Sequence, residues 1–213
     1  PDPRVDEHVS GWSEVEVIEG ASRGDDRPLV AEAIRFLTAP PDAPFFLFLH
    51  FMGTHWPFRS EATCPGERDR QRRYGCATEA ADRLLGDVFD ALQSAGLSDN
   101  TVIVVTSDHG EFLGEHDRWY HSFTVFDALL RVPFVLYEPG GTPRIVTTPT
   151  GCFDVMKTVL SAANPGPGIA LWGQDFRTDA PTSERPQFAR DAVSDPHRTS
   201  RVTRAVVLGG IKL

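Results

Sequence analysis

The sequence predicts an α/β fold with a largely parallel sheet. Two strongly apolar runs, Phe45–Phe51 and Thr101–Ser107, have the composition of strands that are covered on both faces. Between them, Tyr74–Ala95 carries one apolar stripe at helical spacing. A helix that connects two buried strands forms a β-α-β unit, and such units build parallel sheets with helices packed on their faces.

The other elements follow in order along the chain. Apolar side chains at helical spacing predict a first helix over residues 27–39, after a polar segment. The long helix is predicted to end at Gly96, because glycine is the usual residue just past a helix C-terminus. The remaining predictions are a third strand within residues 132–141, a short helix at 151–163 and a hairpin at 201–213 that turns at Gly209–Gly210.

These elements predict three segments: a polar N-terminal segment at 1–26, part of an α/β domain at 27–180 and small C-terminal subdomain strands at 181–213. The net charge of −9, with scattered basic residues, argues against a nucleic-acid partner. No apolar stretch reaches the about 20 residues of a membrane span. The chain begins with Pro1 and shows no leader peptide, so the compartment is left open, and the start is expected to be processed, trimmed or cut from something longer.

The three cysteines, Cys64, Cys76 and Cys152, lack the CxxC spacing of a zinc knuckle. Their odd number favours plain thiols. A single Cys64–Cys76 bridge in an oxidising compartment is the alternative.

Chemically active side chains follow the two predicted strands. His50 lies at the end of the first and His55 comes after it, and Asp108, His109 and Glu111 come after the second. Ligands of open α/β sheets bind beyond the carboxyl ends of the strands, so both segments are candidates for one site. Carboxylate and imidazole together suit a divalent metal, and a following glycine lets a substrate or ion approach. The alternatives are a helix N-cap at Asp108 and a surface or packed histidine at position 55.

Several motifs occur together in a fixed order. The sequence THWPF at 54–58 precedes YGCATEAADRLLGDVFDALQSAGLSDNTVIVVTSDHGEFLGEH at 74–116, and LLRVPFVLYEPG at 129–140 follows. Together with residues 151–176 and 204–213, they resemble the sulfatase family of the alkaline phosphatase superfamily over Leu29 to Leu213. The resemblance implies a three-layer α/β/α sandwich with a largely parallel central sheet and a small C-terminal antiparallel sheet or hairpin.

The resemblance also implies roles for four residues. Asp108 and His109 match a pair of metal ligands, and His55 matches the histidine that contacts the transferring sulfuryl or phosphoryl oxygens. His121 stands about where sulfatases place a lysine. In having a histidine at this position, the sequence resembles phosphoethanolamine transferases and many sulfatase-like hydrolases. The implied cofactor is one divalent ion, with calcium expected first and manganese, magnesium or zinc as alternatives. No role is assigned to His116.

The implied activity is metal-dependent hydrolysis of sulfate esters of small molecules or glycans. A phosphoryl or phosphonate ester hydrolase, or a phosphoethanolamine transferase-like enzyme, is one alternative, and a truncated, non-catalytic scaffold is the other. No C/S-x-P-x-R nucleophile motif of sulfatases precedes the THWPF segment, and neither Cys64–Arg68 nor Asp25–Asp26 replaces the missing nucleophile and early carboxylates. The chain is therefore expected to be the C-terminal portion of a sulfatase domain and to be inactive alone. Its substrate and oligomeric state are left open.

Overall fold

The computed structural model describes residues 24–58, 64–121, 124–147, 150–163, 173–178, 185–192, 202–208 and 211–212. The chain divides into two units, Pro1–Ser98 and Asp99–Leu213. The predicted segment boundaries at residues 26 and 180 stay predictions, and residues 1–23 lie outside the described ranges. Within those ranges, every helix is too short or too polar to span a bilayer.

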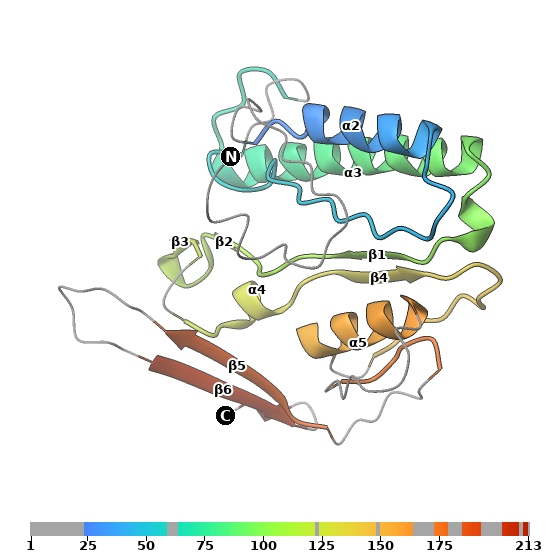
Figure 1. The fold of residues 1–213 in the computed structure, drawn as a ribbon. Coiled ribbons are helices and arrows are strands. Elements are labelled where there is room, and N and C mark those ends of the chain that lie inside the picture. Colours follow the sequence, from blue (N-terminus) through green and yellow to red (C-terminus); the bar gives the residue numbers. More distant parts are fainter. Residues whose placement is uncertain are drawn as a thin grey trace. The chain divides into compact units, whose positions relative to one another are not determined.

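Both predicted helices are present in the first unit, where they lie side by side (Figure 1). Helix α2 spans Arg27–Thr38, and helix α3 spans Arg70–Ser94, so α3 begins earlier than the predicted residue 74. The earlier start has a local cause, because the Asp69 side chain accepts a hydrogen bond from Arg72 N at 2.9 Å and caps the helix. Gly96 adopts a φ of 70° just past the helix end, as predicted. The buried apolar residues of the two helices are Val30, Ala33, Leu37, Ala77, Val88 and Leu92.

The predicted strand at Phe45–Phe51 is not found: no strand is assigned there. Exposure alternates along the run, with Phe46 52% and Phe48 71% exposed, whereas the neighbouring Phe45 packs its ring edge-on against Phe36 of α2 at 5.1 Å. Within its own unit, the segment thus packs one face, through Phe45, against α2. An apolar run without polar alternation cannot by itself tell how many faces are covered, and this is why the prediction of a buried central strand was wrong.

A disulfide joins Cys64 to Cys76 and ties the loop before α3 to the second turn of that helix. The prediction of plain thiols was therefore wrong for this pair, whereas Cys152 remains a thiol. An odd cysteine count does not exclude one local bridge, since the two partners lie only 12 residues apart in the sequence. The segment Cys64–Arg68 is a loop, as predicted.

Reduction of the Cys64–Cys76 bridge is expected to destabilise the first unit. The bridge closes a short loop, and removing such a restraint from the unfolded chain costs about 3 kcal/mol of unfolding free energy. Urea denaturation with and without a reducing agent measures this difference. The Cys152→Ser variant serves as a control and should respond to the reductant as the parent does. A reductant effect within error of zero would contradict a stabilising bridge.

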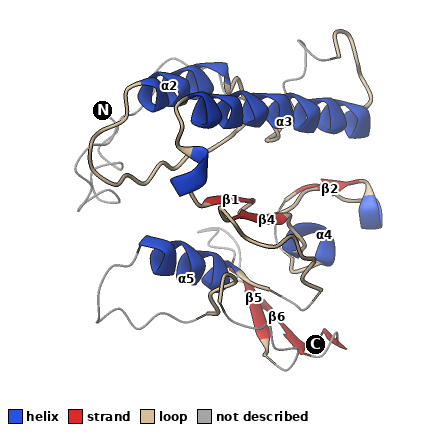
Figure 2. Cartoon of the chain, turned by 90° about the vertical axis from the view of Figure 1, so that its right-hand side faces the viewer, coloured by secondary structure: helices blue, strands red, loops and turns tan. Residues whose placement is uncertain are grey.

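The second unit contains a two-stranded antiparallel sheet (Figure 2). Strand β1 spans Ile103–Thr106 and pairs with β4, which spans Phe134–Tyr137. The predicted, largely parallel sheet is not found, because all strand pairs of the described residues are antiparallel. A parallel neighbour requires a crossover, usually a helix, and the described part of the connection consists of a hairpin with a 3-10 turn and one turn of α-helix. These are β2 (Phe112–Leu113), the 3-10 turn η2 (Glu115–Asp117), β3 (Trp119–Tyr120) and α4 (Asp127–Leu130).

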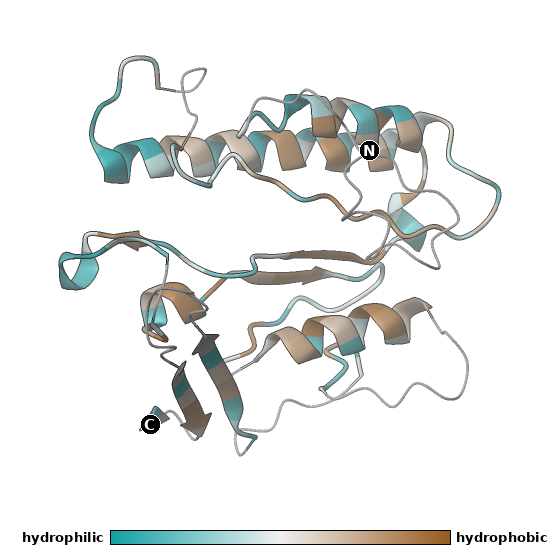
Figure 3. Ribbon diagram, turned by 60° about the vertical axis from the view of Figure 1, so that its left-hand side comes forward, coloured by the Kyte–Doolittle hydropathy of each residue, from teal (hydrophilic) through white to brown (hydrophobic). Residues whose placement is uncertain are grey.

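The C-terminal elements agree with the sequence analysis. Helix α5 spans Cys152–Ala163 and is largely apolar along its length (Figure 3). A three-stranded antiparallel sheet follows, with the order β5-β6-β7. Its last hairpin pairs Leu208 with Ile211, so the predicted hairpin is found, whereas the predicted turn residues Gly209 and Gly210 lie outside the described residues. The strands are β5 (Gln187–Ala192), β6 (Val202–Leu208) and β7 (Ile211–Lys212).

One fully buried carboxylate joins these C-terminal elements. Asp154, in the first turn of α5, is 0% exposed and accepts hydrogen bonds from Gly151 N and Gln174 N at 2.8 Å each. The Arg185 guanidinium, two residues before β5, donates two further bonds to it at 2.6 and 2.5 Å. Burial on its own raises the pKa of Asp154, but the bonds from Arg185 and the two backbone N–H groups outweigh burial, so the pKa lies below its ordinary value. The ion pair is a structural anchor that the sequence analysis did not find.

Candidate metal and anion site

The residues Asp108 and His109 lie directly beyond the end of β1, as predicted. No helix begins at Asp108, so the alternative of a helix N-cap is wrong. Instead, Asp108 Oδ1 accepts a bond from His109 N at 2.9 Å, and Ser107 Oγ donates to His109 O at 2.7 Å. These bonds shape an irregular turn that leaves the Asp108 side chain 73% and the His109 side chain 43% exposed. The turn therefore presents one carboxylate and one imidazole to solvent.

The geometry of this pair suits a shared divalent ion. His109 Nδ1 lies 2.9 Å from Gly110 O, and because a carbonyl only accepts, Nδ1 carries the proton and Nε2 carries the lone pair in the neutral ring. His109 Nε2 lies 3.6 Å from Asp108 Oδ2, so one ion could contact both atoms. A metal-ligating histidine commonly donates its other N–H to a backbone carbonyl, as His109 does.

Gly110 has a different role from the one predicted. Its N–H donates to Leu129 O at 2.8 Å, and a Cβ at this position would lie 2.0 Å from Ala128 O. The lack of a side chain therefore makes room for the backbone of α4 rather than for a substrate or ion. This close approach fixes the Asp108–His109 turn against α4.

His121 lies beside the predicted metal ligands. Its ring centroid is 4.2 Å from that of His109, with the two rings tilted by 35°. Its Nδ1 lies 3.2 Å from Oε1 of Glu111, whose side chain is only 8% exposed. The β2–β3 hairpin explains the meeting, because pairing of Phe112 with Tyr120 brings residues 111 and 121 opposite each other. The buried carboxylate thus holds one edge of the His121 ring.

No role was predicted for Glu111, although the sequence contains an indication that it lies near His121. The stretch from Glu111 to His121 is short enough for a hairpin, and hairpin register places its two ends together. His116, within the hairpin connection, stacks its ring on Phe126 at 4.6 Å with an interplanar angle of 22°. The ring contact of His116 is thus with Phe126 and is separate from the cluster of Asp108, His109 and His121.

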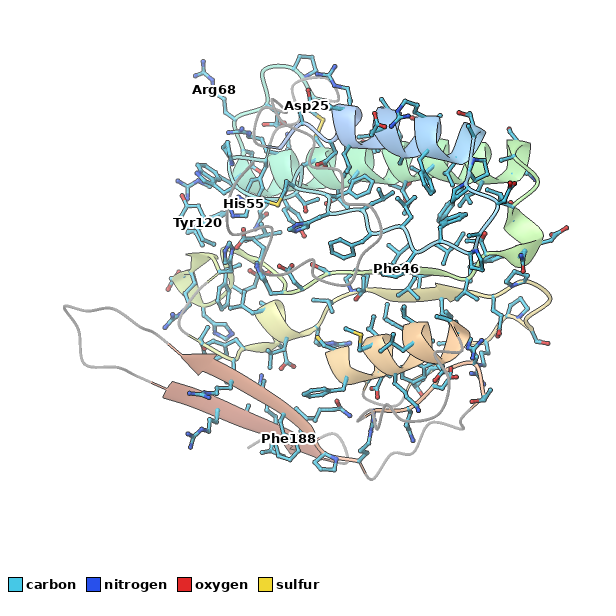
Figure 4. The ribbon with its side chains drawn as sticks, in the orientation of Figure 1. Asp25, Phe46, His55, Arg68, Tyr120 and Phe188 are labelled. Atoms are coloured by element: carbon cyan, nitrogen blue, oxygen red, sulfur yellow. A yellow bond between two sulfur atoms is a disulfide. The ribbon has the colours of Figure 1, made fainter. Side chains whose placement is uncertain are left out.

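His55 lies in the first unit, on the turn Met52–Phe58 (Figure 4). His55 N donates to Met52 O at 3.1 Å, and Phe58 N donates to His55 O at 2.9 Å. The ring Nδ1 lies 2.8 Å from Trp56 O, and the residue is exposed rather than packed in a core. The structure thus brings Asp108, His109 and His121 together within the second unit and describes His55 in the first. That His55 joins the other three stays a prediction.

The described residues contain no cluster of three or more His, Cys, Asp or Glu side chains that could hold a metal ion. Calcium takes 6–8 oxygen ligands and structural zinc takes about four ligands, so Asp108 and His109 would supply only part of either set. Their atom types, spacing and exposure nevertheless fit two ligands of a divalent ion.

Comparison with known proteins identifies the family. The model of the family described as Sulfatase matches residues 3–165 of this chain. The chain belongs to the sulfatase family, within the alkaline phosphatase superfamily. The family resemblance stated from the motifs is thereby confirmed. Sulfatases typically use a divalent metal.

Two curated relatives illustrate the sequence match. The choline-sulfatase of Rhizobium meliloti is 34% identical over 104 residues, which is 49% of this chain and 19% of the relative. The mouse (Mus musculus) steryl-sulfatase is 34% identical over 182 residues, which is 76% of this chain and 29% of the relative. The chain thus spans less than a third of the length of either relative.

Solved structures confirm the α/β fold class. A protein from a Bacteroides thetaiotaomicron locus for the metabolism of multiple glycosaminoglycans matches with a TM-score of 0.69 and 19% identity, over 84% of this chain and 46% of that chain. The phosphonate monoester hydrolase of Silicibacter pomeroyi matches with a TM-score of 0.52 and 28% identity, over 66% of this chain and 33% of that chain. The described residues thus form part of a sulfatase fold, of which only small antiparallel sheets are assigned.

Proposed function

We propose that this chain contributes two metal ligands and two anion-contacting histidines to the hydrolysis of sulfate esters. The observation that carries the proposal is the arrangement beyond β1, where Asp108 Oδ2 lies 3.6 Å from His109 Nε2 and the His121 ring lies against that of His109. Family membership supports the activity class. Calcium is the first candidate for the ion, with manganese, magnesium and zinc as alternatives.

Each residue then has a defined task. A bound divalent ion would supply positive charge that stabilises the negative charge spread over the oxygens of the transferring group. Asp108 and His109 would hold that ion, with Gly110 O keeping the His109 ring in the tautomer that leaves Nε2 to the metal. Glu111 would orient His121 through Nδ1, so that the other ring nitrogen, Nε2, can contact the transferring oxygens or the leaving oxygen. His55 is the second anion-contacting histidine of the proposal.

The proposal assigns no nucleophile to this sequence, because no C/S-x-P-x-R motif precedes the THWPF segment at 54–58. The residues Ser194–Arg198 match the spacing S-x-P-x-R, but they come after all the strand-end motifs and lie outside the described residues. The proposal therefore assigns binding and charge stabilisation to this chain, and it assigns bond formation to a group outside it. The chain by itself is accordingly proposed to be inactive as a sulfatase.

A phosphoryl or phosphonate ester is the second candidate substrate class. Two observations favour it: the 28% identity to a phosphonate monoester hydrolase, and a histidine at position 121 rather than a lysine. Histidine can donate a proton near neutral pH, whereas lysine acts mainly as a fixed charge.

Anion titration distinguishes the two classes. Inorganic sulfate and methylphosphonate are added separately to the full chain with excess calcium, and the histidine ring signals are followed by NMR. We expect sulfate to shift the signals of His109 and His121 at the lower concentration. His121→Gln removes the imidazole that is proposed to contact the anion. Sulfate binding should therefore weaken by on the order of tenfold or more, since hydrogen bonds to charged groups are the stronger ones.

The matched control is His116→Gln, which removes a histidine that stacks on Phe126. This variant should bind sulfate as the parent does. Tighter binding of methylphosphonate would favour the second substrate class. Absence of any shift with either anion, or equal weakening by both substitutions, would overturn the proposed role of His121.

A further inference from the structure

A buried carboxylate in the first unit contacts the turn that carries His55. Asp26 is 7% exposed, and each of its carboxylate oxygens accepts one backbone N–H from that turn. Met52 N donates to Oδ1 at 2.7 Å, and Gly53 N donates to Oδ2 at 2.8 Å. Bonds from N–H groups to a buried charged acceptor are short and about twice as strong as bonds between neutral groups.

The position of Asp26 makes these contacts informative. It occupies the N-cap position of α2, where an aspartate usually accepts bonds from the first turn of its own helix. No such side-chain bond forms here, and Val30 N instead bonds to the backbone oxygen of Asp26. The carboxylate is thus directed to a segment 26 and 27 residues further along the chain.

Gly53 is fitted to the same contact. A Cβ added at this position would lie 2.6 Å from Asp26 Oδ2, closer than real Cβ atoms approach an oxygen. Any side chain at position 53 would therefore displace either the carboxylate or the turn. Gly53 directly precedes the THWPF motif, and its contact with the buried Asp26 carboxylate gives a structural reason for a glycine at this position.

The turn transmits this restraint from Met52 to His55. Met52 O accepts from His55 N at 3.1 Å, and His55 O accepts from Phe58 N at 2.9 Å, so the backbone on both sides of His55 is bonded. At the far end, Arg73 of α3 donates to Pro57 O and to Phe58 O. The Phe58 side chain is 2% exposed and packs edge-on against the ring of Tyr74 at 5.4 Å.

We propose that Asp26 is a positioning residue for His55: its carboxylate holds the Met52–Gly53 backbone and thereby sets where the imidazole stands. The functional part of this inference rests on the proposed anion-contacting role of His55. Arg73 fixes the end of the turn, and Asp26 fixes its beginning. A displacement of a contacting group by about 1 Å can cost on the order of 100-fold in rate. The restraint that Asp26 places on the Met52–Gly53 backbone would therefore matter for catalysis.

The test uses two substitutions that break the contact from opposite sides. Asp26→Asn keeps the shape but replaces one acceptor oxygen with a donor, and Gly53→Ala inserts the Cβ that collides with the intact carboxylate. The matched control is Asp25→Asn, which alters the adjacent aspartate, whose carboxylate accepts two bonds from the Arg27 guanidinium. Amide hydrogen exchange and histidine ring NMR are measured on the full chain.

We expect the Met52 and Gly53 amides to exchange on the order of 10- to 100-fold faster in both test variants and not in Asp25→Asn. The ring signals of His55, assigned with His55→Gln, should also move or broaden in both test variants, because the Nδ1 contact with Trp56 O depends on the turn. Unchanged exchange at both amides, or an unmoved His55 signal in spite of faster exchange, would overturn the positioning role.

Sulfate titration separates this inference from the proposed function. If sulfate shifts the His55 signal in the parent, the test variants should weaken that binding by about tenfold or more, in line with the loss of a charge-assisted bond. If sulfate leaves His55 unaffected in the parent, the proposed role of His55 in catalysis fails. The positioning role of Asp26 is then tested by amide exchange and the His55 ring signal alone.

Discussion

The Arg185→Ala variant is expected to be about 3–5 kcal/mol less stable than the parent, a large fraction of the stability of a domain of this size. The reason is the environment of Asp154, which is 0% exposed and receives two bonds from the Arg185 guanidinium. Without the guanidinium, a buried negative charge keeps only the N–H groups of Gly151 and Gln174 among its bonds described above. Urea denaturation followed by circular dichroism measures the loss.

An exposed ion pair in the same unit provides the control. Lys212 Nζ lies 2.6 Å from Asp127 Oδ1, and the Asp127 side chain is 65% exposed. Such pairs are worth about 0–1 kcal/mol, so Lys212→Ala should change stability little. A loss in Arg185→Ala no larger than that in Lys212→Ala would contradict the anchoring role of the buried pair.

The same ion pair makes stability depend on pH. The pKa of Asp154 is lowered in the folded chain relative to its ordinary value of 3.8, so folding favours the ionised carboxyl. The resulting contribution is fully present above about pH 4 and is lost as the pH falls through the lowered folded value. In Arg185→Ala the carboxyl is buried without its cation, so the gap in stability between parent and variant should narrow as the pH falls below about 4.

Local patterns predicted the helices well. The apolar stripes of α2 and α3, and Gly96 at the end of α3, are properties of short segments and do not depend on distant contacts. The partner of each strand could not be predicted in this way. The run Phe45–Phe51 and strand β1 are both apolar, yet only β1 is assigned as a strand, and its partner β4 runs antiparallel.

The candidate site shows the same division. The pair Asp108–His109 was found because the two residues are adjacent in sequence and follow a strand. Glu111 was not assigned a role, because its contact with His121 arises only when the β2–β3 hairpin forms. Asp26 was set aside because it precedes a helix, and its bonds to Met52 and Gly53 depend on how α2 meets a later turn. A side chain that supports a site from far along the sequence, as Asp26 does, leaves no local pattern.

The central claim is that Asp108 and His109 bind a divalent metal ion. Manganese(II) tests it directly, because this paramagnetic ion broadens NMR signals of nearby groups even when binding is weak. The ion is titrated into the parent chain, into Asp108→Ala and into Asp117→Asn. Asp117 is a matched acidic control, because it is exposed and close in sequence, and asparagine tolerates its φ of 55°.

In the parent and in Asp117→Asn, we expect broadening to be strongest at Asp108, His109 and His121. Asp108→Ala removes the carboxylate ligand and should weaken this effect by on the order of 10- to 100-fold, while broadening elsewhere on the acidic chain stays the same. Equal broadening of these three residues in the parent and in Asp108→Ala would contradict the assignment of Asp108 and His109 as metal ligands.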